Sequence, residues 1–334
     1  PGQLVDKLIE FPVGILPKQV AFTPDSAELW VTLLGGDGLE VYTPLTGQLI
    51  EEVDLPQAGA VEVIFNRAGS FAYVSQMETG RVYEIDVASK NVLRTLQTSG
   101  SWTKVIALSA DEQTLFASNW VSNDVSVFDL ATGEETDRVP TVTTPRGLAV
   151  TPNGRYLYVA GFERGDLEVI DLVTGEGEVI LETGGAYRHL VLDPTGSRLY
   201  GSDMAADAIY VTELATAATT HLADVNRLPN TIDLSPDGRV LFVSNRGRNN
   251  PESYLLIGPE WGSVLLIDTT TGRPLDAIVA GNQTTGLDVS PDGALLAFSD
   301  FRDDRVSVFA IPSYEVLAEG NGGRYQAHLS ELEK

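Results

Sequence analysis

The chain repeats one pattern of apolar and polar positions seven times. Each repeat has an alternating apolar run, a tight turn resembling Ser-Pro-Asp-Gly, a second run rich in Tyr, Phe, Leu and Val, a polar loop and a third run. When the second turn residue is taken as the anchor of its repeat, the anchors are Pro24, Arg67, Ala110, Pro152, Pro194, Pro236 and Pro291. Successive anchors lie 42 or 43 residues apart, except the last pair, which lie 55 apart. A fixed period of this length is typical of repeat architectures, and the longer spacing indicates an insertion in the sixth repeat.

Turn residues divide each repeat into short strands. In the fourth repeat the expected strands are 147–150, 156–160, 167–172 and 179–181. Pro, Asn, Asp and Gly recur between them because these residues fix or tolerate the backbone angles of a tight turn. Four strands per unit at this period are typical of a propeller blade. The sequence therefore predicts an all-β fold, a seven-bladed β-propeller of four-stranded antiparallel blades.

The first run of every repeat is apolar at two fixed positions, four and two residues before the anchor. The residues at these positions are Val20 and Phe22, Val63 and Phe65, Ile106 and Leu108, Leu148 and Val150, Leu190 and Leu192, Ile232 and Leu234, and Leu287 and Val289. This regularity is expected of innermost strands, because neighbouring blades bury one another's faces.

The two ends of the chain indicate how the ring closes. Residues 2–12 read like 47–56, which follow the third strand of the first repeat, so we expect them to form an outer strand of the seventh blade. Residues 315–318 are a second candidate for that edge, and a lost eighth blade is the alternative. We therefore predict one propeller domain over 1–325 and a C-terminal tail over 326–334.

Several segments resemble the YVTN family of β-propellers. They are Leu-Tyr-Val-Ala at 157–160, Leu-Phe-Val-Ser-Asn at 241–245, Asp-Val-Ser-Val-Phe-Asp at 124–129 and Thr-Gly at 132–133. The resemblance covers essentially the whole chain and implies the propeller fold. It does not select an activity, because proteins of this type include periplasmic and surface-layer proteins, and related propellers include lactonases and cofactor-bearing oxidoreductase domains.

Composition limits the remaining possibilities. The 334 residues include 47 acidic and 22 basic side chains, with a formal net charge of −25, and no Cys. This balance argues against general adhesion to nucleic acid or anionic membrane, and the lack of Cys excludes disulfides and Cys-ligated zinc. No apolar run approaches the length of a membrane span. An acidic, Lys-poor chain that begins at Pro1 fits removal of a signal peptide, so we expect a periplasmic or extracellular location.

Basic residues gather at one end of the predicted channel. The residues six before each anchor, at the start of each inner strand, are Lys18, Val61, Lys104, Arg146, Arg188, Asn230 and Thr285. Loops after the second strands add Arg164, Arg246, Arg248 and Arg302 to the same face. Converging cations in a concave mouth attract carboxylates or phosphates. The alternative is that they form structural salt bridges with Glu62, Glu163, Asp203, Asp300 and Asp303.

Aromatic residues interleave with these cations. Trp102 and Tyr187 lie beside them in the sequence, and Trp120, Phe162 and Phe301 lie in the outgoing loops. Aromatic faces next to cations suit sugars, acidic peptides or single-stranded nucleic acid, whereas the alternative is packing over the blade tops. The insertion at 246–261 carries Tyr254 and Trp261 and serves either recognition or shielding of the channel.

Few residues offer catalysis or metal binding. His189 could act as a general base or be a hydrogen-bonded structural residue, and Glu62 could activate water. Asp233 and Asp288, three before their anchors, place adjacent carboxylates in the channel that could hold Ca²⁺ or bond to water. We predict no other cofactor. Walker, His-Glu-x-x-His and Gly-x-Ser-x-Gly motifs are absent.

These features lead to three competing functions. The first is a non-catalytic extracytoplasmic binding or scaffold module that recognises a protein, a glycan or a small anionic ligand at its cationic and aromatic mouth. The second is a lactonase-like hydrolase that acts on an acidic sugar lactone. The third is single-stranded nucleic-acid binding, which the global charge of the chain disfavours.

Overall fold

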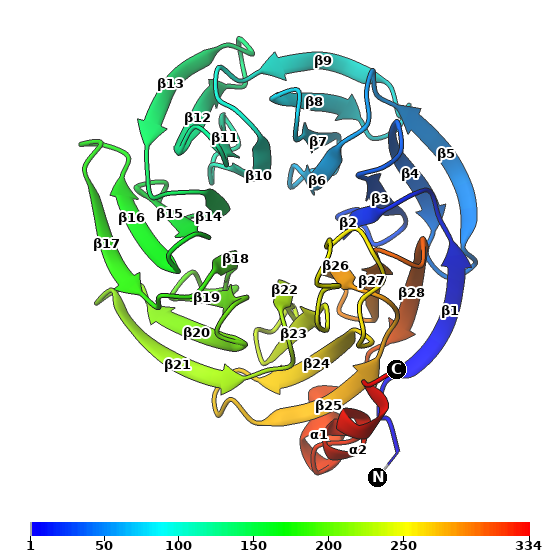
Figure 1. The fold of residues 1–334 in the computed structure, drawn as a ribbon. Coiled ribbons are helices and arrows are strands. Elements are labelled where there is room, and N and C mark those ends of the chain that lie inside the picture. Colours follow the sequence, from blue (N-terminus) through cyan, green and yellow to red (C-terminus); the bar gives the residue numbers. More distant parts are fainter. Residues whose placement is uncertain (1) are drawn as a thin grey trace.

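The computed structural model describes residues 2–334, which form seven four-stranded sheets arranged as blades around a central channel (Figure 1). Blade 1 contains β2 (Pro17–Phe22), β3 (Leu29–Leu33), β4 (Gly38–Thr43) and β5 (Gln48–Asp54). Blade 2 contains β6 (Ala60–Phe65), β7 (Phe71–Gln76), β8 (Arg81–Asp86) and β9 (Val92–Gln97). Blade 3 contains β10 (Thr103–Leu108), β11 (Thr114–Asn119), β12 (Asp124–Asp129) and β13 (Glu135–Pro140). Blade 4 contains β14 (Pro145–Val150), β15 (Tyr156–Gly161), β16 (Asp166–Asp171) and β17 (Gly177–Glu182).

The remaining blades follow the same order. Blade 5 contains β18 (Tyr187–Leu192), β19 (Arg198–Asp203), β20 (Ala208–Glu213) and β21 (Ala218–Asp224). Blade 6 contains β22 (Pro229–Leu234), β23 (Val240–Asn245), β24 (Ser263–Asp268) and β25 (Pro274–Val279). Blade 7 contains β26 (Thr284–Val289), β27 (Leu295–Asp300), β28 (Arg305–Ala310) and, at its outer edge, β1 (Asp6–Pro12). All pairs are antiparallel, and the predicted seven-bladed fold is confirmed.

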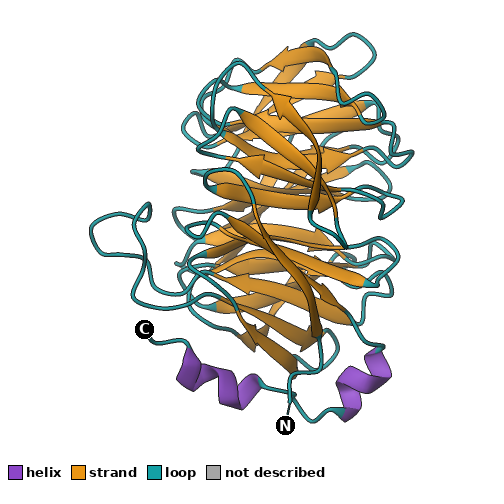
Figure 2. Cartoon of the chain, turned by 90° about the vertical axis from the view of Figure 1, so that its right-hand side faces the viewer, coloured by secondary structure: helices purple, strands orange, loops and turns teal. Residues whose placement is uncertain are grey.

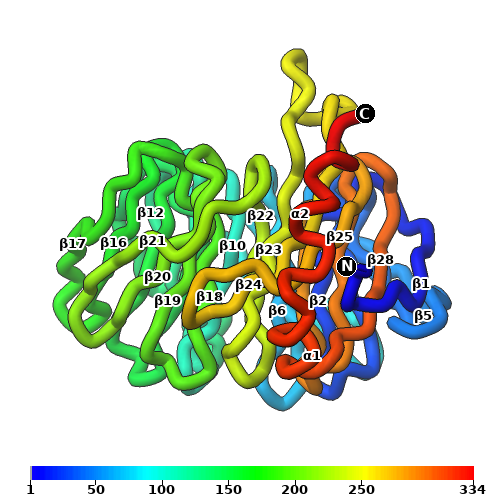
Figure 3. The backbone as a smooth tube through the Cα atoms, turned by 90° about the horizontal axis from the view of Figure 1, so that it is seen from below, coloured from blue at the N-terminus to red at the C-terminus, as the bar shows by residue number. Residues whose placement is uncertain are grey.

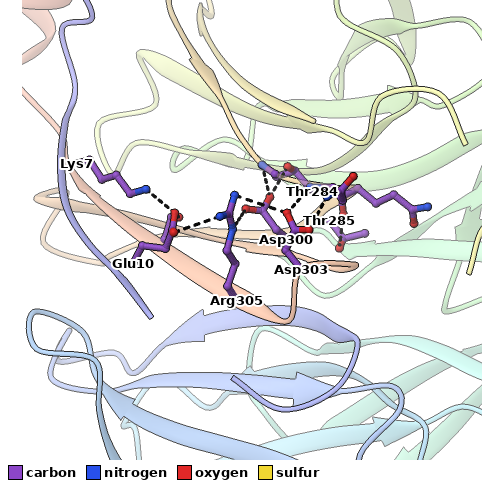
Figure 4. Close-up of polar contacts among 11 residues, drawn as sticks. Lys7, Glu10, Thr284, Thr285, Asp300, Asp303 and Arg305 are labelled. Carbon is purple, nitrogen blue, oxygen red and sulfur yellow. Dashed lines mark hydrogen bonds and ion pairs between the residues drawn. The ribbon is translucent and has the colours of Figure 1, made fainter. Parts of the chain in front are cut away.

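The N-terminal strand closes the ring, as the sequence predicts. β1 pairs with β28 over Asp6–Pro12, so the two ends of the chain share one sheet. A polar network fastens this edge (Figure 4). The Arg305 guanidinium contacts Glu10 of β1 at 3.1 Å and Asp300 of β27 at 2.9 Å, and Lys7 pairs with the same Glu10. Removal of β1 would leave β28 as an exposed edge strand.

Residues 315–318 form no strand, so this candidate for the edge is wrong. They lie in helix α1 (Tyr314–Glu319), whose N-terminus is capped by the Ser313 side chain. β1 already occupies the free edge of β28, so a second strand finds no partner there, and the Ser cap favours a helical start. Leu317 is fully buried in the apolar cluster of blades 6 and 7, where α1 lies along the rim beside β25 (Figure 1).

The C-terminal residues lie against the insertion of the sixth repeat. After α2 (Tyr325–His328) and the short 3₁₀ helix η1 (Leu329–Glu331), the Trp261 N–H donates to the Leu332 carbonyl at 2.7 Å. Lys334 donates to the Gly258 carbonyl at 2.7 Å. The loop between β23 and β24 projects from one face of the ring, with the C-terminus nearby (Figures 2 and 3). Among the residues that the structure describes, no helix is long and apolar enough to cross a membrane.

Apolar inner strands hold the blades together. The residue four before each anchor is buried in all seven blades, from Val20 in blade 1 to Leu287 in blade 7. Second-strand residues such as Trp30, Phe242 and Phe298 are also fully buried between the sheets. This packing makes a rigid frame on which the loops at the channel mouth are held.

Candidate anion-binding site

A bulge at the start of each inner strand directs side chains into the channel. The ladder between inner and second strand shifts register at this point, for example between Thr103 and Ile106 and between Pro145 and Leu148. A hydroxyl of the second strand fills the gap in the ladder. In blade 3, Ser118 accepts from the Val105 N–H at 3.1 Å and donates to the Arg146 carbonyl of blade 4 at 2.9 Å. Ser75 of blade 2 donates in the same way to the Lys104 carbonyl at 2.5 Å, so the backbone of Lys104 and that of Arg146 are each held by the preceding blade.

Five cationic side chains from five blades meet at the mouth. A cavity of about 310 Å³ is lined by Lys18, Lys104, Arg146, Arg188 and Arg246. The first four come from inner strands, and Arg246 directly follows β23. The sequence predicts this convergence from the repeat register alone.

Aromatic rings form the walls between these cations. The Lys104 ammonium lies 5.4 Å from the ring centre of Trp102 and 5.2 Å from that of Trp120, and the Arg146 guanidinium lies 5.6 Å from that of Trp120. On the other side, Arg246 lies 5.9 Å from Tyr254 in the projecting loop. The rings stabilise the cations by their negative faces but do not neutralise them.

No carboxylate pairs with any of the five cations within residues 2–334. Arg188 donates from Nε to the Asn230 side-chain oxygen at 2.8 Å, and Arg246 donates to the Gln283 side chain. Both partners are neutral amides. Of the carboxylates that could have formed salt bridges, Asp300 and Asp303 contact Arg305, and Glu62 lies deeper in the channel. The mouth therefore lacks counter-charges for its basic side chains, in a protein of net charge −25.

Burial and mutual repulsion make this charge costly. Burial, with repulsion from Arg146 and Arg188, lowers the pKa of Lys104 to about 6. Burial lowers the pKa of Arg146 to about 10 although Glu62 opposes the shift. Burial and neighbouring cations also hold the pKa of Lys18 and of Arg188 well below their usual ranges. A bound anion would relieve both effects, because it supplies the missing counter-charge.

A second chamber lies deeper in the channel, below the cations. It has a volume of about 300 Å³ and is lined by Glu62, His189, Asp233 and Asp288 among apolar inner-strand residues. Burial, opposed by the nearby cations, raises the pKa of the Glu62 carboxyl to about 7. Burial and Arg188 lower the pKa of His189 to about 3, so this imidazole is neutral at physiological pH. The ring nitrogen Nδ1 of His189 accepts from the Ile232 N–H at 3.4 Å.

The two aspartates of the lower chamber link neighbouring blades by hydrogen bonds. Asp233 of blade 6 accepts from the Val289 N–H of blade 7 at 2.8 Å, and Asp288 of blade 7 accepts from the Phe22 N–H of blade 1 at 2.7 Å. Burial raises the pKa of Asp233 to about 6, and burial together with the Asp233 charge raises the pKa of Asp288. In the described part of the chain no cluster of three or more His, Asp or Glu could hold a metal ion.

Some predicted site residues lie away from the mouth cavity. Tyr187 is fully buried inside blade 5, where its ring packs on Tyr210. Arg164 and Arg248 are exposed and pair with Glu182 at 3.8 Å and Glu260 at 2.5 Å. Asn230 supports Arg188. Arg302 is half-buried and does not line the cavity, and its Nε is buried without a hydrogen-bond partner in residues 2–334.

The mouth also contains residues that the sequence did not single out. Met77, Met204 and Asn249 line the cavity beside the cations, and Gln283 binds Arg246. Met77 and Met204 each directly follow a second strand, at the same position of the repeat as Trp120 and Phe162. Because two other blades carry an aromatic residue at that position, the repeat register could have identified Met77 and Met204 as residues of the mouth.

The fold and the mouth cavity define a seven-bladed propeller with a polar central site. Comparison with known proteins identifies its family. Residues 17–187 match the model of a family described as lactonase, 7-bladed β-propeller. The chain is 35% identical over 311 residues to antigen Lp49 of Leptospira interrogans, covering 90% of this chain and 68% of that protein. The protein belongs to the lactonase-type seven-bladed β-propeller family.

A solved structure shares the architecture at low sequence identity. A chain of the Kuenenia stuttgartiensis hydrazine synthase superposes with a TM-score of 0.77 at 17% identity, covering 90% of this chain and 97% of that one. Identity at this level supports the fold alone.

Proposed function

We propose that this protein is a non-catalytic, extracytoplasmic binding module whose channel mouth captures a small, multiply charged anion. The observation that carries the proposal is the set of five buried or half-buried cations without a carboxylate partner in residues 2–334. Several positive charges in one cavity favour a ligand with two or more negative charges, because each uncompensated charge in a desolvated site is costly. Carboxylates and phosphates match the donors of Arg and Lys.

The size and walls of the cavity restrict the ligand further. A volume of about 310 Å³ is at the lower end of ordinary small-molecule sites, so a compact ligand fits better than a chain segment. Trp102, Trp120 and Tyr254 offer flat apolar surfaces for the uncharged part of the ligand. An acidic sugar, a sugar phosphate or a tricarboxylate has this combination of properties.

A location outside the cytoplasm agrees with two features. The relative at 35% identity is named an antigen, and the chain combines many acidic residues with the absence of Cys. Separation of cell fractions followed by immunoblotting of the native protein tests this part of the proposal. Recovery in the cytoplasmic fraction alone would contradict it.

Calorimetric titration with sulfate, phosphate and citrate tests anion binding. We expect citrate to bind more tightly than sulfate, and Arg146→Gln to weaken citrate binding at least tenfold through loss of a charged hydrogen bond. Arg164→Gln is the matched control, because it removes the same charge from an exposed, ion-paired position on the same face. Equal loss in both variants, or no binding by the unmodified protein, would refute the site.

A lactonase-like hydrolase is the second candidate, because the family match and Glu62 both favour it. A carboxyl whose pKa is about 7 can take a proton from water near neutral pH. If the protein hydrolyses acidic sugar lactones, Glu62→Gln should abolish turnover while citrate still binds. Turnover retained in Glu62→Gln but lost in His189→Ala would assign the base to His189 instead.

A further inference from the structure

A second groove lies between blades 3 and 4, on the face opposite the mouth. Its volume is about 650 Å³, and its floor is apolar, with Phe116 and Val139 from blade 3 and Leu172 from blade 4. The carboxylates of Asp111 and Asp137 stand at its rim. The groove also includes the turn after β14, which marks the end of the inner strand away from the cations.

In the two preceding blade junctions, a cation of the chain itself occupies the equivalent place. Between blades 2 and 3, Arg94 donates to the Leu130 carbonyl at 2.5 Å and pairs with Glu84 at 2.8 Å. Between blades 1 and 2, Lys90 donates to the Val87 carbonyl and pairs with Glu28 at 2.8 Å. Val87 and Leu130 are repeat equivalents, since each directly follows the third strand of its blade.

The junction between blades 3 and 4 keeps the carbonyl acceptor but has a carboxylate at the position of the cation. Strand register aligns the pair Glu84 and Arg94 of blade 2 with Val127 and Asp137 of blade 3. Leu172 directly follows the third strand of blade 4, as Leu130 does in blade 3, and no side chain in residues 2–334 donates to its carbonyl. The groove therefore offers an unused carbonyl, a carboxylate and an apolar floor.

We propose that this groove binds an arginine-containing segment of a partner protein. The guanidinium would donate to the Leu172 carbonyl and to Asp137, as Arg94 donates to Leu130 and Glu84 one blade earlier. Its aliphatic stem would cover Phe116. Arginine suits the site better than lysine because its planar fork reaches two separated acceptors. The net charge of −25 attracts a basic segment to the protein as a whole.

Calorimetry with the blocked peptide acetyl-Leu-Arg-Leu-amide tests the proposal. The matched peptide carries citrulline, which has the same shape without the charge. We expect the arginine peptide to bind at least tenfold more tightly than the citrulline peptide, and Asp137→Asn to remove most of that difference. Glu178→Gln is the control, because it removes one exposed carboxylate from the outer strand of blade 4.

A second variant fills the groove from within. Val127→Glu combined with Asp137→Arg copies the Glu84 and Arg94 pair into blade 3 and should abolish peptide binding while citrate binding persists. If this double variant does not fold by circular dichroism, Asp137→Asn alone decides the question. Equal affinity for both peptides, or an effect of Glu178→Gln as large as that of Asp137→Asn, would overturn the proposal. Concentration-dependent dimerisation that Asp137→Asn abolishes would also overturn it, because the occupant would then be a second copy of the chain.

Discussion

Replacement of Lys104 by Met should stabilise the unliganded protein and weaken its anion site at the same time. The ammonium lies half-buried between Trp102, Trp120 and Met77, with Arg146 and Arg188 close enough to repel it. Met has nearly the same length, fills the same space among these apolar groups and carries no charge. The variant thus removes the electrostatic cost of the empty mouth without opening a cavity.

The structure sets the size of the effect. The pKa of Lys104 falls from 10.5 to about 6, and each pKa unit corresponds to about 1.36 kcal/mol, so the cost of the charge is at most about 6 kcal/mol. Water at this half-buried position screens part of the repulsion. Loss of the two cation–π contacts of Lys104 reduces the gain in stability by about 1–2 kcal/mol. We therefore expect Lys104→Met to raise the free energy of unfolding by about 2 kcal/mol.

Urea denaturation at several pH values measures this gain. A folded-state pKa below the unfolded value means that, between pH 6 and 10.5, the unfolded chain binds more protons at Lys104 than the folded chain does. The stability of the unmodified protein then rises with pH through this window. The advantage of Lys104→Met should be greatest below pH 6 and fade as pH approaches 10.5.

The control variant removes a charged side chain that is exposed to solvent. Arg164→Met removes an exposed guanidinium and should change the free energy of unfolding by no more than about 0.5 kcal/mol at any pH. A Lys104→Met variant that loses stability, or that gains the same amount at pH 6 and pH 10, would refute the electrostatic reasoning.

Three further changes test other parts of the structure. Asp288→Ala removes the acceptor of the Phe22 N–H at the junction of blades 7 and 1 and should cost about 1–3 kcal/mol in thermal unfolding, whereas Glu178→Ala should cost little. The raised pKa values of Asp233 and Asp288 mean that the folded state binds protons that the unfolded chain releases. The stability of the unmodified protein should therefore decrease as the pH rises from 4 to 6, and this decrease should be smaller in Asp288→Asn. Glu62→Gln should reduce the loss of citrate affinity that we expect above pH 7, where the ionised carboxyl repels the ligand, and a pH series by calorimetry would contradict this if the two proteins behaved alike. Ser118→Ala frees the Arg146 carbonyl and should weaken citrate binding a few-fold, with Ser89→Ala in an exposed turn as the comparison.

The fold was predictable because one pattern recurs seven times. A single strand of six residues carries a weak signal, but seven copies with apolar residues four and two before the anchor leave little room for another fold. The helix at 314–319 was not predicted because its sequence is equally compatible with a short strand. The difference arises from β1, which already occupies the edge that a strand would need.

The site was predictable only in part, because the bulge in each inner strand breaks the two-residue alternation. Arg188 points into the mouth and His189 into the chamber below, whereas alternation would place them on opposite faces of the sheet. Tyr187, one residue earlier, turns into the blade. The sequence also does not show which arginines form salt bridges. Arg248 pairs with Glu260 across its own loop, whereas Arg146 pairs with no carboxylate in residues 2–334.

The acidic surface and the cationic mouth act on the proposed ligand in opposite directions. At low ionic strength the net charge of −25 repels an approaching anion and slows its entry. At about 0.15 M salt the Debye length is about 8 Å, so the field of exposed carboxylates is screened before the anion reaches the mouth. Buried cations are screened far less than exposed ones. Salt therefore lowers the barrier to entry more than it weakens the bound state.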